Sequence, residues 1–237
     1  DIELRRLRIT NRSQSRKTID VTSYAEVVLA SAASDSLHPA FSNLFVQTEI
    51  IDRLQSILCT RRPRSVDEAT PWMFHLTAVH GADMENVSYE TDRMRFIGRG
   101  NTLVEPQAMK DLSALSGSQG SVLDPVVAIR CQMTLEPGQM VVMDMVTGMS
   151  DTREGALSLA EKYHDRRLAD RVSELAWTHS QVVLRQINAT ESDAQLYRRI
   201  ANSILYANPS LRAEPDILMK NRRGQSGLWG YTVSGDL

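Results

Sequence analysis

The residues best suited to chemistry gather in the last stretch of the chain, residues 221–237. This stretch holds four of the twelve glycines and two of the nine Trp and Tyr residues, a local enrichment typical of a ligand-facing segment. Glycine lets a backbone approach a ligand closely, and these aromatic side chains offer a flat apolar face with a polar group. The sequence therefore indicates Trp229 and Tyr231 as candidate sugar platforms and Asp236 as a candidate hydroxyl acceptor.

The same stretch has a second interpretation that involves no ligand. It could be a glycine-rich loop in which a helical linker joins another domain, with Trp229 packed in the seam. The residues alone leave both interpretations open. The chain opens directly on strand-like alternation and ends within this signal-bearing segment, so we expect it to be part of a longer protein.

A second candidate lies in residues 89–100, which are rich in charge and include Glu90, Asp92, Arg93, Arg95 and Arg99. Arginine side chains bind phosphate or sugar hydroxyls through their forked N–H groups. The same residues would equally form a salt-bridged loop. The Gly98-Arg-Gly100 segment lacks the strand and helix that flank a dinucleotide-binding turn, so it predicts no such site.

Residues 115–125 resemble a phosphate-binding loop only in their Gly and Ser content. They lack the GxxxxGK[ST] pattern, and the residues that follow read as a strand rather than a helix. We therefore predict a structural turn. Carboxylates are plentiful along the chain, but no spacing singles out an acid and base pair, so no catalytic residue is assigned.

Cysteine, histidine and charge exclude several classes of site. Cys59 and Cys131 lie in apolar, strand-like runs without a local histidine, which predicts reduced, unligated thiols. The five histidines form no HxH, HExxH or Cys/His cluster, so no metal site is indicated. The net charge of -2 gives no reason to expect nucleic acid as a partner. The sequence contains no run of about 18 apolar residues, so it predicts no membrane-spanning segment.

Residues 1–148 read as β structure, because short apolar and β-branched segments alternate with turn signals. Loops are expected at 31–39 and 61–71, and Glu136-Pro137-Gly138 predicts a hairpin between the strands that flank it. The pattern favours a sandwich or barrel. The expected strands lie near residues 2–9, 18–29, 44–51, 55–60, 72–79, 126–135 and 140–147.

The hydrophobic period changes from 2 to 3.6 near residue 150, which predicts helices at about 151–163, 167–187 and 191–207. Asp151 and Thr190 are the expected first residues of two of them, each in a capping-box pattern. Trp177 and Tyr197 are interpreted as core-packing residues. The predicted division is a β-sandwich domain at 1–148, a helical linker at 149–208 and a further segment at 209–237.

A set of motifs, in order along nearly the whole chain, resembles one region of the bacterial cyclic β-1,2-glucan synthases. That region is similar to the glycoside phosphorylases that include cellobiose and chitobiose phosphorylases. The resemblance implies an antiparallel β-sandwich of the supersandwich type, a helical linker and, at 209–237, the start of an (α/α)6 catalytic barrel. The motifs are DIELRRLRITNRS, TIDVTSYAEVVLA, HPAFSNLFVQTE, TRRPRS, YETDRMRFIGRG, LSGSQGSVLDPV, ELAWTHSQ and GQSGLWGYTVSGDL.

The resemblance also implies an activity for the parent module, which is inverting phosphorolysis or glycosyl transfer on β-1,2-glucans that controls chain length. Inorganic phosphate would be the co-substrate, and an Asp in an Asp-Trp-Asn motif would be the general acid. This chain lacks that motif. We therefore expect no cofactor in this chain and no activity from it alone.

The resemblance further implies where the chain acts and with what. The implied partners are a β-glucan oligosaccharide, the rest of the catalytic barrel and a second copy in a homodimer. The implied location is the cytoplasm, within a larger inner-membrane protein that this segment does not itself anchor. The alternative function is that of a non-catalytic carbohydrate-binding or scaffold sandwich.

Overall fold

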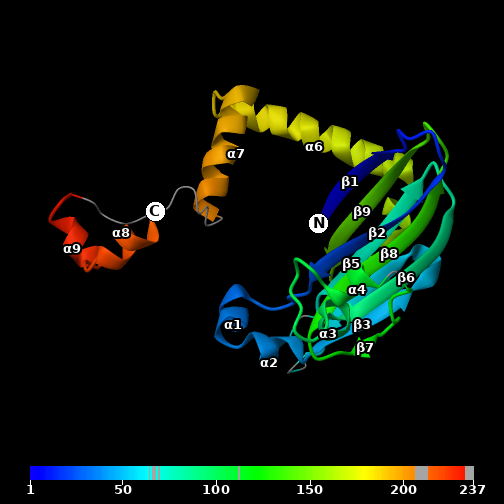
Figure 1. Ribbon diagram of the computed structural model, residues 1–237, viewed down its shortest axis with the longest axis horizontal. Coiled ribbons are helices and arrows are strands. Elements are labelled where there is room, and N and C mark those ends of the chain that lie inside the picture. The colour runs from blue at the N-terminus through cyan, green and yellow to red at the C-terminus, as the bar shows by residue number, and fades with distance from the viewer. Residues whose placement is uncertain (64, 66–67, 69, 112, 206–212, 233–237) are drawn as a thin grey trace. The chain divides into compact units, whose positions relative to one another are not determined.

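The computed structural model describes residues 1–63, 65, 68, 70–111, 113–205 and 213–232. Its contacts divide the chain into two compact units, Asp1–Ala176 and Trp177–Leu237. The strands of the described part all lie in the first unit (Figure 1). They are β1 (Ile2–Thr10), β2 (Lys17–Glu26), β3 (Val46–Ile51), β4 (Ser56–Arg61), β5 (Trp72–His80), β6 (Met84–Asp92), β7 (Gly120–Ser121), β8 (Pro125–Leu135) and β9 (Met140–Ser150).

These strands form two sheets whose paired strands run antiparallel. The larger sheet has six strands in the order β1-β9-β5-β4-β3-β7, and the smaller has three in the order β2-β8-β6. The antiparallel β-sandwich expected from the sequence is therefore confirmed, together with several helices. The start of an (α/α)6 barrel is not shown and stays a prediction.

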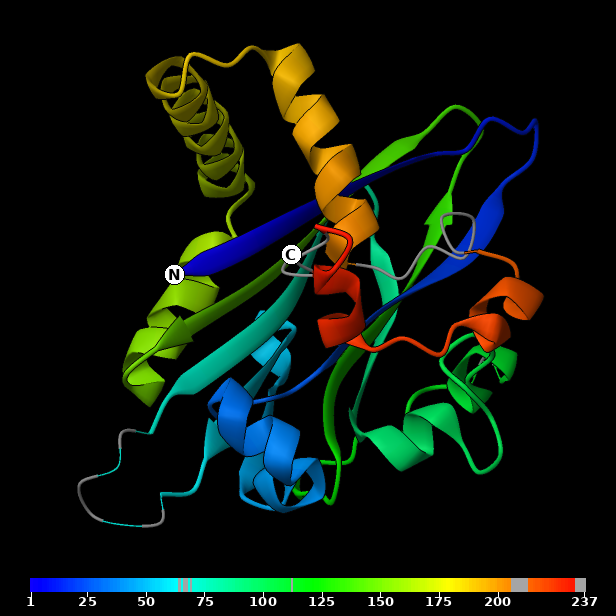
Figure 2. The same ribbon diagram turned by 90° about the vertical axis from the view of Figure 1, so that its left-hand side faces the viewer.

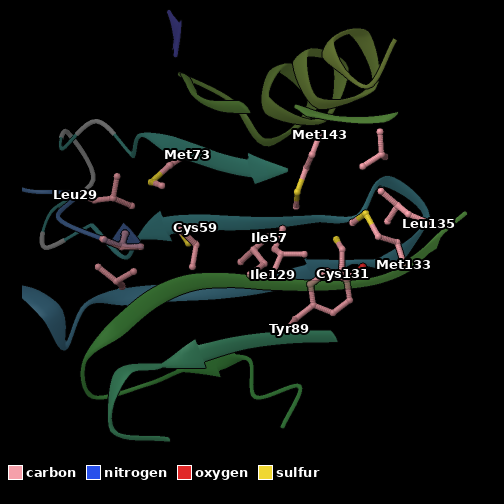
Figure 3. Packing of buried hydrophobic residues seen from close by; sticks show 14 residues of the cluster. Leu29, Ile57, Cys59, Met73, Tyr89, Ile129, Cys131, Met133, Leu135 and Met143 are labelled. Carbon is pink, nitrogen blue, oxygen red and sulfur yellow. The ribbon is translucent and has the colours of Figure 1, made fainter. Parts of the chain in front are cut away.

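The main core lies between the two sheets and is rich in sulfur. Cys59, Met73 and Met143 of the six-stranded sheet belong to one cluster with Cys131 and Met133 of the three-stranded sheet (Figure 3). Both cysteines are buried free thiols, and burial raises the pKa of each thiol to about 12. A thiol that ionises so poorly is a weak nucleophile, so both cysteines behave as small hydrophobic groups.

The middle strands of the six-stranded sheet, β4, β5 and β9, are largely buried on both faces. The second face of this sheet packs against α5 (Arg153–Tyr163), where Ala156 and Ala160 contact a cluster that includes Phe74 and Val146. Strands covered on both sides do not need the alternation of apolar and polar residues that a half-exposed strand shows. This explains why β5 and β9 are nearly continuous apolar runs in the sequence.

Gly148 of β9 makes this packing tight, because an added Cβ would lie 2.5 Å from Cε1 of the Phe74 ring and 2.8 Å from Cγ2 of Ile2. Overpacking a core typically costs about 1–3 kcal/mol. We expect Gly148→Ala to lower the free energy of unfolding by about 3 kcal/mol in urea denaturation. At Gly230 an added Cβ meets nothing within 4 Å, so Gly230→Ala is the matched control.

A second substitution shows whether the clash causes the loss. Phe74→Leu removes the ring atoms that the added Cβ would meet, so it should cost less in the Gly148→Ala background than alone. Strict additivity of the two losses would mean that Gly148 acts by another route.

Three of the short connections between the two sheets contact one another, and one of them corrects a prediction. Residues 136–139 join β8 to β9, which lie in different sheets, so the predicted hairpin is wrong. Asn11, in the β1–β2 connection, exchanges backbone hydrogen bonds of 2.8 and 3.0 Å with Gly138 and Gln139. Gln139 Nε2 also donates to the Gly81 carbonyl in the β5–β6 connection at 2.6 Å. The three crossings therefore brace one another.

Two segments that the sequence indicated as loops contain short helices, which Figure 2 shows in blue and green. Residues 31–39 contain α1 (Ala32–Leu37), which α2 (Pro39–Asn43) follows; residues 89–100 contain the end of β6 and α3 (Arg93–Ile97), with α4 (Gln107–Lys110) further on. The side chains of Ser31 and Asp92 cap α1 and α3 by accepting hydrogen bonds from backbone N–H groups. These caps stabilise helices that are too short to show a hydrophobic period.

The three long helices lie where the sequence places them, as α5, α6 (Arg166–Gln186) and α7 (Glu191–Leu205). The N-cap of α5 is Thr152 rather than Asp151, because Thr152 Oγ1 accepts from the Gly155 N–H at 3.0 Å. The predicted cap at Thr190 is confirmed: Thr190 Oγ1 accepts from Asp193 N at 3.3 Å, and Asp193 Oδ2 accepts from Thr190 N at 2.8 Å.

The helices of the second unit leave many apolar side chains exposed. Trp177 is 67% exposed and Tyr197 is 52% exposed, so their interpretation as core residues is wrong. Two short helices follow, α8 (Pro215–Lys220) and α9 (Gln225–Trp229). The division of the chain at residues 148 and 208 stays a prediction.

Candidate functional site

Two of the three predicted sugar-binding residues lie in the described part of the second unit. Trp229 ends α9 and Tyr231 follows two residues later, with 61% and 60% of their surfaces exposed. The guanidinium carbon of Arg223 lies 4.6 Å from the centre of the Tyr231 ring, which is cation–π distance. Asp236 lies outside the described residues. The structure thus brings two exposed aromatic side chains to one short helical turn.

The densest polar cluster of the sandwich unit centres on Glu90 of β6, which is only 2% exposed. Its Oε1 accepts hydrogen bonds from the N–H groups of Thr91 and Asp92, both at 3.0 Å, and from the Ser118 hydroxyl. Its Oε2 accepts from Ser116 Oγ at 2.7 Å. The serine-rich loop therefore binds a carboxylate of its own chain, as a structural turn would.

Arg130 of β8 is a buried basic side chain, 4% exposed, that also binds the loop after α3. Its Nη1 donates to the carbonyl oxygens of Asp111 at 3.1 Å and Ser113 at 2.6 Å. Its Nη2 donates to the Ala108 carbonyl, and its Nε donates to Thr22 Oγ1 at 3.1 Å. A planar guanidinium can make several such bonds at once. Arg130 and Glu90 together hold residues 107–111 and 113–118 over the outer face of the three-stranded sheet.

The arginines of residues 89–100 divide between structural and surface positions. Arg93 Nε donates to Glu26 at 2.9 Å, and its Nη1 lies 3.6 Å from Asp124. The hydrogen bond to Glu26 raises the pKa of Arg93. Arg95 donates to Ser116 Oγ at 3.2 Å and keeps a side chain that is 61% exposed. Arg93 is therefore a brace, whereas Arg95 stays at the rim of a surface hollow.

His75 of β5 bridges the two sheets. Its Nε2 lies 2.9 Å from Ser23 Oγ in β2, and its Nδ1 lies 2.9 Å from Thr147 Oγ1 in β9. Burial, with a smaller contribution from the charge of Arg5, lowers the pKa of His75 to about 4. The imidazole is therefore neutral at pH 7. Among the described residues, no carboxylate accepts a hydrogen bond from either nitrogen of the His75 ring. The Ser–His pair therefore lacks the acid that completes a hydrolytic triad.

A second buried carboxylate fastens a helix to the six-stranded sheet. Asp144 is fully buried and receives Arg6 in bidentate fashion, with Nε to Oδ1 at 2.6 Å and Nη2 to Oδ2 at 2.8 Å. Arg6 Nη1 also binds Asp170 of α6, which lowers the pKa of Asp170. His80 Nε2 lies 3.6 Å from Asp144 Oδ2. The cluster joins β1, β9 and the first turns of α6.

These contacts favour positioning and binding over acid–base chemistry. Glu90 and Asp144 are each held by several donors, and no group of His, Cys, Asp and Glu in the described ranges could hold a metal ion. None of the described helices is long and apolar enough to cross a bilayer. Sequence reasoning missed Arg130 and Asp144, although each interrupts an apolar strand, which is the signal that could have found them.

Comparison with known proteins supports the motif-based resemblance. Residues 1–166 match the family model described as Glycosyl hydrolase 94, supersandwich domain. The chain is also 34% identical over 236 residues to the Cyclic beta-(1,2)-glucan synthase NdvB of Rhizobium meliloti (strain 1021). The matched region covers 100% of this chain and 8% of that protein, so the chain corresponds to a small part of the relative.

Proposed function

Because the chain belongs to the glycosyl hydrolase 94 supersandwich family, we propose that it is the supporting part of a phosphorylase-like module that acts on β-1,2-glucans. In this proposal the parent protein is a cyclic β-1,2-glucan synthase, and the module controls glucan chain length. The chain supplies the sandwich and the linker on which a catalytic barrel is assembled. Inorganic phosphate is the co-substrate of the parent module, and no cofactor is assigned to this chain.

The observation that carries the proposal is the apolar surface of α6 and α7. Their side chains repeat at helical spacing, yet α7 has no buried residue. Soluble proteins rarely leave contiguous apolar surface of this extent without a partner. The side chains are Leu175, Trp177, Val182, Val183, Leu196, Tyr197, Ile200, Ile204 and Leu205, with Ile187 directly after α6, all at least 39% exposed. The rest of the catalytic barrel is the partner that the proposal assigns to this surface.

The division of labour follows from the chemistry of phosphorolysis. Phosphate is already a nucleophile, so the reaction needs one acid to protonate the glycosidic oxygen and no base to activate water. We place that acid outside this chain, whose buried carboxylates are occupied by structural hydrogen bonds. Trp229, Tyr231 and Asp236 remain proposed as the rim of the substrate pocket. A homodimer and a cytoplasmic position within an inner-membrane protein remain part of the proposal.

The proposal is tested by two substitutions on α7, Ile200→Ser and Ile204→Ser, made together. In the 237-residue chain both side chains are exposed, so the free energy of unfolding should change by less than about 1 kcal/mol. In the full-length protein they should be buried, so the same pair should cost about 3 kcal/mol and reduce glucose 1-phosphate release from β-1,2-glucan. Arg198→Ser on the same helix is the control.

The unmodified proteins give the complementary result. The full-length protein should release glucose 1-phosphate from β-1,2-gluco-oligosaccharides and inorganic phosphate, and the 237-residue chain alone should not. A full-length protein whose melting temperature and phosphorolysis ignore the Ile200 and Ile204 substitutions would contradict the proposed assembly role.

A further inference from the structure

The outer face of the three-stranded sheet is hollowed in a way that the supporting role does not require. The α3–α4 segment covers part of this face, where Phe96 and Ile97 pack against Ala128 and Tyr24. Beside it lie two adjoining hollows of ≈ 410 and ≈ 230 Å³, which share Ala114 and Arg130 as lining residues. The two hollows therefore adjoin at these residues, and we name them together the sheet groove.

The floor of the smaller hollow is an ordered row of polar side chains, one from each strand of the sheet. Asn86 Nδ2 in β6 donates to Gln132 Oε1 in β8 at 3.0 Å. Gln132 Nε2 in turn donates to Asp20 Oδ1 in β2 at 3.1 Å. Within the part of the chain that the structure describes, Asp20 Oδ2, Asn86 Oδ1 and the second Nε2–H of Gln132 have no hydrogen-bond partner, so they can bind a ligand. The row therefore presents donors and acceptors side by side in fixed positions.

The larger hollow is lined by buried side chains that already make hydrogen bonds within the protein, and exposed side chains stand at its rim. Glu90 and Arg130 form part of its lining, but their hydrogen bonds hold residues 107–111 and 113–118 in place. Arg95 and Gln107 stand at the rim, and Leu115 contributes an apolar patch. A hollow that keeps its shape without a ligand loses little conformational entropy on binding.

The acidic and basic residues that line the sheet groove nearly balance one another in charge. Its lining has three acidic residues, Asp20, Glu90 and Asp111, and two basic residues, Arg95 and Arg130. A near balance of sign attracts neither a polyanion nor a polycation strongly. A ligand that suits this lining is neutral, long enough to cross both hollows, and rich in hydroxyl groups that donate and accept hydrogen bonds. A chain of sugar rings has these properties.

We propose that the sheet groove, whose lining includes no residue of the Gly224–Tyr231 segment, binds a neutral gluco-oligosaccharide chain. The identification of the sugar as a β-1,2-glucan rests on the proposed function above. No aromatic platform lines either hollow among the described residues, so the dissociation constant should be on the order of 0.1–1 mM. A site of this weak affinity would keep a growing glucan chain near the module and still release it quickly.

The test is a titration of the ¹⁵N-labelled 237-residue chain with linear β-1,2-gluco-oligosaccharides of increasing length, followed by NMR. We expect amide shifts at Asn86, Ser88, Ala114 and Gln132, and tighter binding of chains that are long enough to cross both hollows. Arg95→Ala and Gln132→Ala act on opposite hollows, and each should weaken binding about 5- to 10-fold. Ala114→Trp, placed where the hollows meet, should weaken binding of long chains most.

Controls outside the sheet groove match the variants in side-chain type. Arg8→Ala on β1 and Gln47→Ala on β3 are exposed positions of the other sheet and should leave binding unchanged. Shifts confined to residues 213–232, the absence of shifts at 10-fold above the expected dissociation constant, or equal effects of variants and controls would overturn the proposal. Preference for a β-1,4- over a β-1,2-linked chain would support the sheet groove and contradict the assigned glucan linkage.

Discussion

Replacing Arg130 with methionine should lower the free energy of unfolding by about 3–5 kcal/mol and release residues 107–118 from the sheet. Arg130 supplies the hydrogen bonds of three backbone carbonyls, those of Ala108, Asp111 and Ser113. Methionine keeps the apolar stem but leaves these acceptors without a donor. Urea denaturation measures the loss, and amide hydrogen exchange of residues 107–118 locates it.

Two further variants separate the contribution of the guanidinium fork from the loss of charge. Arg130→Lys keeps the charge but offers one nitrogen in place of the planar fork, so its stability should fall between those of the wild type and Arg130→Met. Arg95→Met is the matched control, because the Arg95 side chain is 61% exposed, and should stay within about 0.5 kcal/mol of the wild type. Equal stability of Arg130→Met and Arg95→Met would show that Arg130 does not clamp the loop.

The second large effect is expected at Asp144. The substitution Asp144→Asn keeps the shape of a fully buried side chain but removes the charge that Arg6 binds. Removing one partner of a buried ion pair costs about 3–5 kcal/mol, because the remaining charge is left without compensation. We expect a loss of about 3 kcal/mol in thermal or urea unfolding, the lower end because the Arg6 side chain is 15% exposed and keeps its ion pair with Asp170.

An exposed ion pair is the control for this prediction. Arg53 and Glu161 lie 2.5 Å apart with side chains that are 61% and 51% exposed, so Arg53→Ala should cost less than about 1 kcal/mol. If Asp144→Asn costs no more than Arg53→Ala, the buried cluster does not fasten α6 to the sheet. Hydrogen exchange in the first turns of α6 reports the same event locally.

The Arg6 cluster also predicts how stability depends on pH. The hydrogen bond from Arg6 lowers the pKa of Asp170 in the folded chain. A carboxyl whose pKa is lowered by folding stabilises the folded state above its unfolded pKa of about 4. That stabilisation is lost as the pH falls through the lower, folded value. The first turns of α6 should therefore loosen in acid before the strands do.

Sequence by itself determined the kind of structure at most positions in this chain. The change of hydrophobic period near residue 150 separates strands from long helices, and it does so because a period of 2 or 3.6 is a local property of the backbone. The Thr190 cap is likewise encoded within four residues. The motif set also predicted the family correctly, because it compares residues at many positions of the chain at once. The exposed aromatic character of Trp229 and Tyr231 agrees with a ligand-facing segment but does not by itself identify one.

Only the tertiary structure decided which strands are neighbours and which charges are buried. A Glu-Pro-Gly turn at 136–138 reverses the chain equally well within one sheet or between two, and the pairing of β9 with β1 and β5 depends on residues far away in sequence. Glu90 likewise looks like an ordinary surface charge in the sequence, until Ser116 and Ser118 of a distant loop bind its carboxylate. Burial is a property of the whole fold, so the sheet groove could not be located from the order of the residues alone.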